Sequence, residues 1–178
     1  MDTVKNLEKT IGGWYKNVPH LPKGGQQWLA DNVWWLALVG AILSVLGLFV
    51  VIPALLIALA FTSAVTTVTP YSVYYSNDVA GIVWLSLLVG LVSYIVTAVL
   101  LALAVNPLKA KSRKGWEFLF LSYLINFVLG VVSSLVLLNF SGIIGAAVGA
   151  AVGGYFLYEI HSHFVAKHKV AHKASAKV

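Results

Sequence analysis

The sequence predicts an all-α integral membrane protein. It would be a bundle of four transmembrane helices, with an N-terminal amphipathic helix at the membrane surface and both termini in the cytoplasm. Three observations predict this. Of the 178 residues, 60% are hydrophobic and only 10% are charged, whereas a soluble domain is about a quarter charged. Three long stretches contain no charged residue or histidine: 33–76, 80–107 and 119–157. The basic residues fall into only three groups.

The segment 1–31 is expected to lie on the cytoplasmic side. Its apolar residues Val4, Leu7, Ile11 and Trp14 recur at helical spacing, with lysines on the other face. This pattern is typical of a short amphipathic helix in the headgroup region. We interpret it as a surface helix that holds the chain at the membrane surface. The other interpretation is a docking element for a partner or an anionic lipid.

The four-span membrane domain is expected over residues 32–160. A span needs roughly 20 apolar residues, and Pro53 should kink the first one. The β-branched, aromatic and polar stretch after it predicts an extended outer loop, and "KAKSRKG" predicts a basic inner loop. The expected spans are 33–61, 81–105, 116–138 and 142–160, with the outer loop at 62–80, the inner loop at 106–115 and a basic cytoplasmic tail at 161–178.

The basic residues set the predicted orientation. Four precede the first span, four lie between the second and third, and four follow the last. By the positive-inside rule, both termini and the middle loop are cytoplasmic, and we expect a bacterial plasma membrane. Basic groups beside an anionic leaflet attract lipid headgroups. The candidate headgroup contacts are Lys109, Lys111, Arg113 and Lys114.

Small residues predict where helices pack. Gly145, Gly149 and Gly153 are four residues apart and share one face of the fourth span. In lipid, such stripes let helices approach closely. We expect this stripe to face a second stripe on the third span, unless another subunit covers it. The second stripe consists of Asn126, Gly130 and Ser134.

Polar residues at the end of the fourth span raise the question of a metal site. Glu159 and His163 are four residues apart, as are His168 and His172. A zinc site needs three or four ligands, so these pairs fall short, and we predict no metal and no cofactor. We interpret Glu159 as a boundary acid that balances the basic tail.

No motif specifies a reaction, so we predict a non-enzymatic scaffold or accessory subunit. It would assemble through small-residue helix packing, as a homo-oligomer or in a larger membrane complex. The lipid bilayer is the expected partner, and nucleic acid is not. One alternative is a small transporter or channel with a path near Asn126, Tyr123 and Ser134 and a cytoplasmic mouth at Glu159 and His163. Another is a membrane enzyme that uses Glu117, Glu159 and the histidines on an interfacial substrate.

Overall fold

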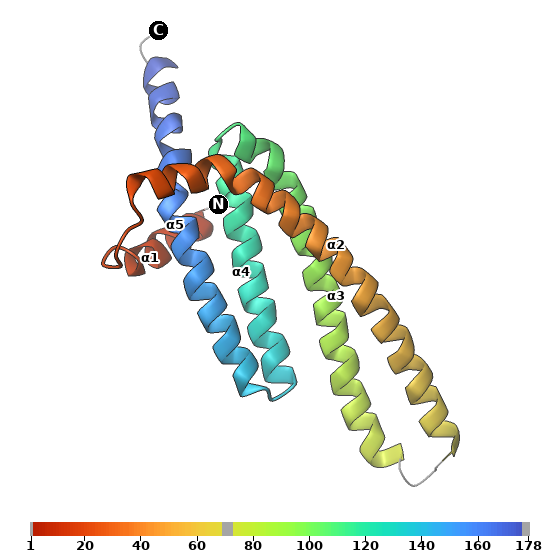
Figure 1. The fold of residues 1–178 in the computed structure, drawn as a ribbon. Helices are drawn as coiled ribbons and strands as arrows, with labels where there is room; N and C mark the ends of the chain where they lie inside the picture. Colours follow the sequence, from red (N-terminus) through yellow and green to blue (C-terminus); the bar gives the residue numbers. More distant parts are fainter. Residues whose placement is uncertain (1, 69–72, 176–178) are drawn as a thin grey trace.

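The computed structural model describes the backbone of residues 2–68 and 73–175, and the side chains of residues 6–61 and 81–164. Within these ranges the chain consists of helices joined by short connections, without a strand (Figure 1). Four helices are long and apolar enough to span a membrane, which confirms the predicted fold class at that level. The helices are α1 (Asp2–Trp14), α2 (Lys23–Val68), α3 (Val73–Lys109), α4 (Arg113–Val136) and α5 (Phe140–Ser175).

The helices extend beyond the predicted spans. Residues 62–80 were expected to form an extended loop, but α2 continues to Val68 and α3 begins at Val73. The β-branched residues that suggested a loop have only a weak preference against helix, which neighbouring turns override. Residues 69–72 lie outside the described part. Pro53 lies inside a continuous α2, and α5 carries the predicted tail as helix to Ser175.

Two tight turns join the later helices. After α3, the amides of Lys111 and Ser112 donate to the carbonyls of Leu108 and Pro107. After α4, the amides of Leu138 and Asn139 donate to the carbonyls of Leu135 and Ser134. Both are Schellman motifs, in which one residue takes a left-handed conformation. That residue is Lys111 (φ 50°) in the first turn and Leu138 (φ 52°) in the second.

The helices pack as neighbours in chain order. α2 lies against α3, α3 against α4 and α4 against α5, and the first part of α2 also crosses α5 (Figure 1). Two glycines allow α2 and α3 to approach closely. A methyl group at Gly47 would lie 2.5 Å from the Tyr94 ring, and one at Gly40 would lie 2.8 Å from Leu101.

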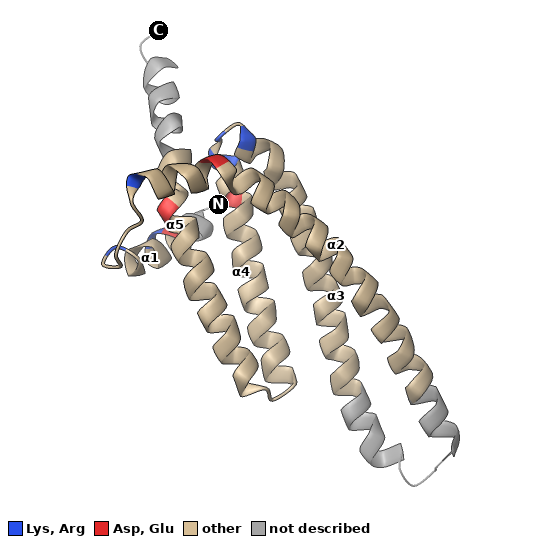
Figure 2. Ribbon diagram, viewed as in Figure 1, with Lys and Arg blue, Asp and Glu red and all other residues tan. Residues whose placement is uncertain are grey.

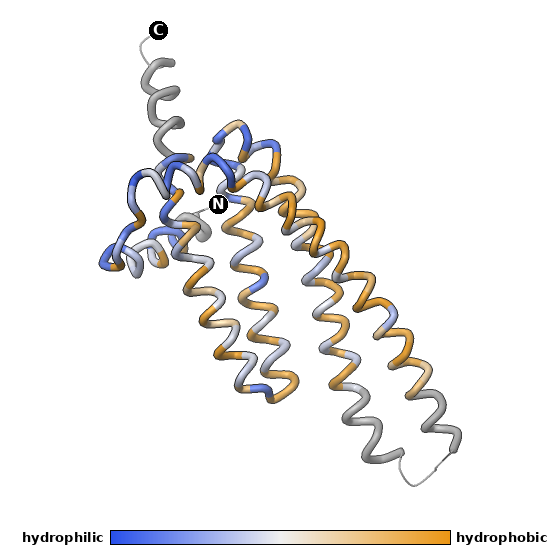
Figure 3. The backbone as a smooth tube through the Cα atoms, in the orientation of Figure 1, coloured by the Kyte–Doolittle hydropathy of each residue, from blue (hydrophilic) through white to orange (hydrophobic). Residues whose placement is uncertain are grey.

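The tightest packing gathers at one end of the bundle. Trp116, Phe120, Leu108, Ile160 and Phe164 are the largest fully buried side chains, and all lie near the α3–α4 connection or far along α5. Along the rest of the described helices most residues are apolar (Figure 3), and many of their large side chains are exposed, as expected of surfaces covered by lipid. The described charged side chains lie at the same end as this core (Figure 2).

Candidate functional site

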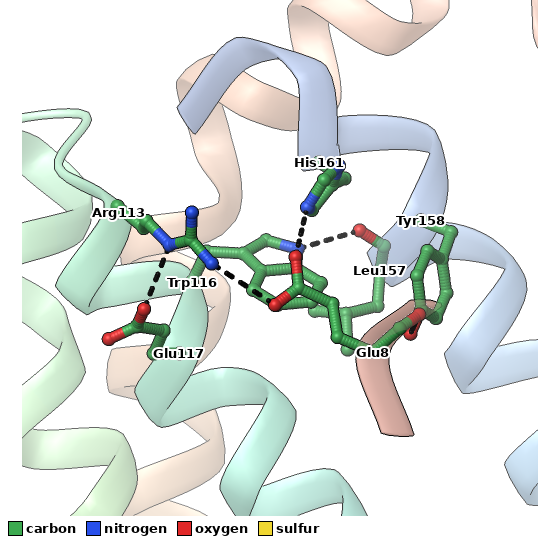
Figure 4. A network of polar contacts seen from close by, with 7 residues as sticks. All are labelled: Glu8, Arg113, Trp116, Glu117, Leu157, Tyr158 and His161. Carbon is green, nitrogen blue, oxygen red and sulfur yellow. Dashed lines mark hydrogen bonds and ion pairs between the residues drawn. The ribbon is translucent and has the colours of Figure 1, made fainter. Parts of the chain in front are cut away.

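The charged end of the bundle holds a polar network around Glu8 (Figure 4). The side chain of Trp116 in α4 lies beside this network. Its indole is fully buried, and its Nε1 donates to the carbonyl of Leu157 in α5 at 3.0 Å. The ring also stacks on Phe120, with centroids 5.1 Å apart. His161 stands edge-on to the same indole, at 4.6 Å. This aromatic packing fixes α4 against α5 and orients the histidine.

Glu8 joins α1 to both of these helices. One carboxylate oxygen lies 2.7 Å from His161 Nε2, and the other accepts from Arg113 Nη2 at 3.2 Å. Tyr158 Oη donates to the Glu8 carbonyl at 2.8 Å. Arg113 also donates through Nε to Glu117 at 2.9 Å. Glu8, Arg113, Glu117 and His161 together form the Glu8 network.

Glu159 of α5 holds the segment between α1 and α2. Its side chain is 3% exposed. It lies 2.6 Å from His20 Nδ1 and accepts from the Leu21 amide at 3.0 Å and from Gln26 Nε2 at 2.8 Å. Nearby, Tyr155 Oη donates to the Pro19 carbonyl at 2.8 Å. A carboxylate with so many donors is fully occupied by its own chain, so its arrangement is that of a structural anchor.

Tyrosines complete the docking of the N-terminal segment. Tyr15 stacks on Tyr158, with ring centroids 5.4 Å apart, and its hydroxyl donates to the Ala151 carbonyl at 3.1 Å. Tyr123 Oη donates to the Ala150 carbonyl at 2.9 Å. Both hydroxyls crowd Gly154, where a methyl group would lie 2.9 Å from Tyr123 Oη. Gly154 and Gly142, where a methyl group would lie 2.5 Å from Ser134 Oγ, are therefore the two crowded glycines of α5.

The predicted glycine stripe is open for most of its length. A methyl group at Gly145 or Gly149 would meet no atom within 4 Å, and one at Gly153 would meet Tyr123 at an ordinary 3.6 Å. A methyl group at Gly130 of α4 would lie 3.7 Å from Ala146 Cβ, and one at Gly142 would lie against Ser134. The two stripes thus meet only in part. Their role in helix packing stays a prediction.

Asn126 turns toward α3 rather than toward the glycine stripe. Its Nδ2 donates to Thr97 Oγ1 at 2.7 Å and to the Ser122 carbonyl at 2.8 Å. Its Oδ1 accepts from Ser93 Oγ at 3.1 Å. The amide therefore finds the hydroxyl and carbonyl partners that a polar group in a span needs. It also borders three cavities, of about 660, 320 and 270 Å³.

The histidines and acids do not converge on a metal. Within residues 6–61 and 81–164, no three groups from His, Asp and Glu come together in a way that could hold an ion. Glu159 bonds His20 rather than His163. The side chains of His168 and His172 lie outside the described part. Glu117 and Glu159 are bonded to different groups, Arg113 and His20, so the structure does not join them in one site.

The predicted headgroup residues are partly engaged within the protein. Lys111 forms an ion pair with Asp31, and Arg113 belongs to the Glu8 network. Lys109 Nζ lies 4.2 Å from the centroid of the Trp34 ring, a cation–π distance. Lys114 is exposed.

Sequence reasoning missed Glu8, His161 and Gly154 as contact residues. A partial signal existed for α1, because the acid Glu8 lies between Lys5 and Lys9 in the predicted surface helix. Ile11, on its predicted apolar face, is buried, while Trp14 on the same face is 70% exposed. Comparison with models of protein families, with curated proteins and with solved structures finds no match to this chain.

Proposed function

We propose that the protein is a non-enzymatic scaffold or accessory subunit of a bacterial plasma membrane, and that it assembles with copies of itself or other proteins through α5. The proposal rests on Gly145 and Gly149, where an added methyl group would meet no atom within 4 Å. Glycine weakens a helix by roughly 0.5–1 kcal/mol relative to alanine. Gly40, Gly47 and Gly142 are matched to close neighbours in the bundle, whereas Gly81 and Gly90 of α3 are as open as this pair. An outward pair at i and i+4 suits a helix from another chain.

The first experiment is the mass of the complex extracted in a mild detergent. We expect a mass well above one 19.2 kDa chain. Gly149→Leu should reduce it, because the added side chain would hold a partner helix away. Val148→Leu is the matched control, since Val148 is an exposed neighbour on α5. A wild-type mass of one chain, or a Gly149→Leu complex of unchanged mass, would contradict the proposal.

The membrane orientation belongs to the same proposal. The gathering of described charged side chains at one end (Figure 2) favours placing that end in the cytoplasm, with both termini there. In this orientation α1 lies along the headgroup region. Its buried Ile11 packs on the bundle, while the exposed Leu7 and Trp14 contact lipid. Lys109 and Lys114 would then contact anionic headgroups.

A small transporter or channel is the second candidate, and one observation favours it. Asn126 borders three cavities, and the one of about 320 Å³ is also bordered by Ser44, Ser93 and Ser133. Glu159 is less suited to line the cytoplasmic mouth of a transport path, because its carboxylate is buried and bonded to His20 and Gln26. Solute flux into liposomes tests this function. It requires flux that Asn126→Leu abolishes while the complex keeps its mass.

A further inference from the structure

The largest of the three cavities is apolar and has no assigned occupant. It measures about 660 Å³, within the range of pockets that bind small molecules, roughly 300–1,000 Å³. Residues from the first part of α2 and from α3, α4 and α5 line it. Its apolar walls include Leu29, Val33, Leu36, Leu101, Leu119 and Phe156.

The side-chain amide and hydroxyl groups in the walls are already paired. Asn126 Nδ2 donates to Thr97 Oγ1 and to the Ser122 carbonyl, and Tyr123 Oη donates to the Ala150 carbonyl. A polar ligand would give up its bonds to water and gain few from these walls. Burying a polar group without a partner is costly. The cavity therefore suits an apolar occupant.

The cavity is too small for a helix of a second chain. An α-helix is about 10 Å across, so 660 Å³ would hold only about 8 Å of its length, or roughly five residues. A transmembrane helix cannot be enclosed in this volume, whereas a single hydrocarbon chain can. Because the bordering helices are candidate spans, hydrocarbon is also the medium around the opening.

The surroundings of the cavity favour a negatively charged headgroup. Trp28 and Trp35 border it, and Asp31, between them in sequence, bonds Lys111. Tryptophan is typical of the level of lipid headgroups. The described side chains at this end include seven Lys or Arg and four Asp or Glu, a difference of three positive charges. Each of the four acids is bonded to a basic group of the chain itself.

We infer that this cavity binds one acyl chain of an anionic phospholipid, with the phosphate directed toward the lysines of the charged end. The inference requires the proposed membrane insertion but not assembly through α5. Its failure is therefore distinguishable from a failure of the mass measurement.

Native mass spectrometry tests the inference on the full-length protein. The protein is stripped of native lipid in detergent and then offered phosphatidylglycerol or phosphatidylcholine with identical acyl chains. We expect wild type to retain one phosphatidylglycerol per chain, at least fivefold more than phosphatidylcholine. Gly153→Leu should reduce retention at least fivefold. Gly153 borders the cavity and a methyl group there makes only ordinary contact, so the leucine can occupy the space.

Two further variants make the test decisive. Leu36→Trp adds bulk from α2 and should also displace the lipid, which covers the case in which Gly153→Leu does not fold. Val152→Phe adds bulk at the residue that precedes Gly153 in α5, where the side chain is exposed, and should retain lipid as wild type does. The inference is overturned if wild type retains no lipid, if the cavity variants retain as much as Val152→Phe, or if the two headgroups bind equally.

Discussion

Gly115 and Gly149 lie inside helices, but the space around their α-carbons differs sharply. A methyl group at Gly115 would lie 2.7 Å from the Leu108 amide nitrogen and 2.8 Å from the Pro107 carbonyl carbon. These backbone atoms cannot move away to make room for the methyl group, so Gly115→Ala should lower the free energy of unfolding by about 1–3 kcal/mol or more. Within one chain a methyl group at Gly149 meets nothing, so in protein that unfolds as a single chain Gly149→Ala should be neutral or stabilising by up to about 1 kcal/mol. Unfolding titrations in detergent measure both, and equal stabilities would contradict this account.

Asn126 tests whether a polar residue in a span joins helices or serves a path. Its bond to Thr97 at 2.7 Å links α4 to α3. Such interhelical bonds contribute about 0.6 kcal/mol on average and at most about 1.7. A double-mutant cycle of Asn126→Leu and Thr97→Val should give a coupling energy in that range. A coupling near zero would show that this bond does not join α4 to α3.

Docking of α1 depends on Glu8, at the scale of one helix on its neighbours. Hydrogen bonds to charged groups contribute about 1.5–3 kcal/mol, and Glu8 has two such partners, Arg113 and His161. Glu8→Ala should therefore release α1 and speed trypsin cleavage after Lys9 and Lys16 by about tenfold or more. Both lysines are exposed, so docking is what limits the protease.

Glu117→Ala is the matched control for α1 docking, because Glu117 also bonds Arg113. That pair is more exposed and lies within one helix, where such pairs contribute about 0.3–0.5 kcal/mol. Cleavage should rise less than about threefold. The assigned role of Glu8 would be wrong if the two variants were cleaved at the same rate.

The turn between α4 and α5 carries strain at Leu138. Its φ of 52° places a branched side chain in the left-handed region, which costs roughly 1–2 kcal/mol. The side chain is 78% exposed, so little packing would be lost. Leu138→Gly should raise the free energy of unfolding by on the order of 1 kcal/mol. Leu137→Gly, at a φ of −83°, should lower it instead. Thermal unfolding of the two variants in detergent distinguishes these signs.

Across the whole molecule, sequence predicts what depends on local composition. Long apolar runs suffice to identify four helices able to span a membrane, because a spanning segment must satisfy its own backbone polar groups in lipid. The docking of α1 could not be predicted, because Glu8 and His161 are 153 residues apart. Their pairing depends on how α4 and α5 pack. The glycine stripe was visible, but only three-dimensional packing distinguishes the crowded Gly154 from the open Gly149.

The orientation of the molecule in its membrane is testable because the chain contains no cysteine. Single cysteines introduced on this background report only on their own positions. Lys114→Cys lies at the charged end, next to the α3–α4 connection, and Ser141→Cys lies at the α4–α5 turn; both native side chains are exposed. Since four basic residues flank the α3–α4 connection and none flanks the α4–α5 turn, the positive-inside rule places only the turn outside. A membrane-impermeant maleimide should label Ser141→Cys in intact cells, and should label Lys114→Cys only after permeabilisation. The reverse pattern would place the charged end outside and would contradict the proposed cytoplasmic termini.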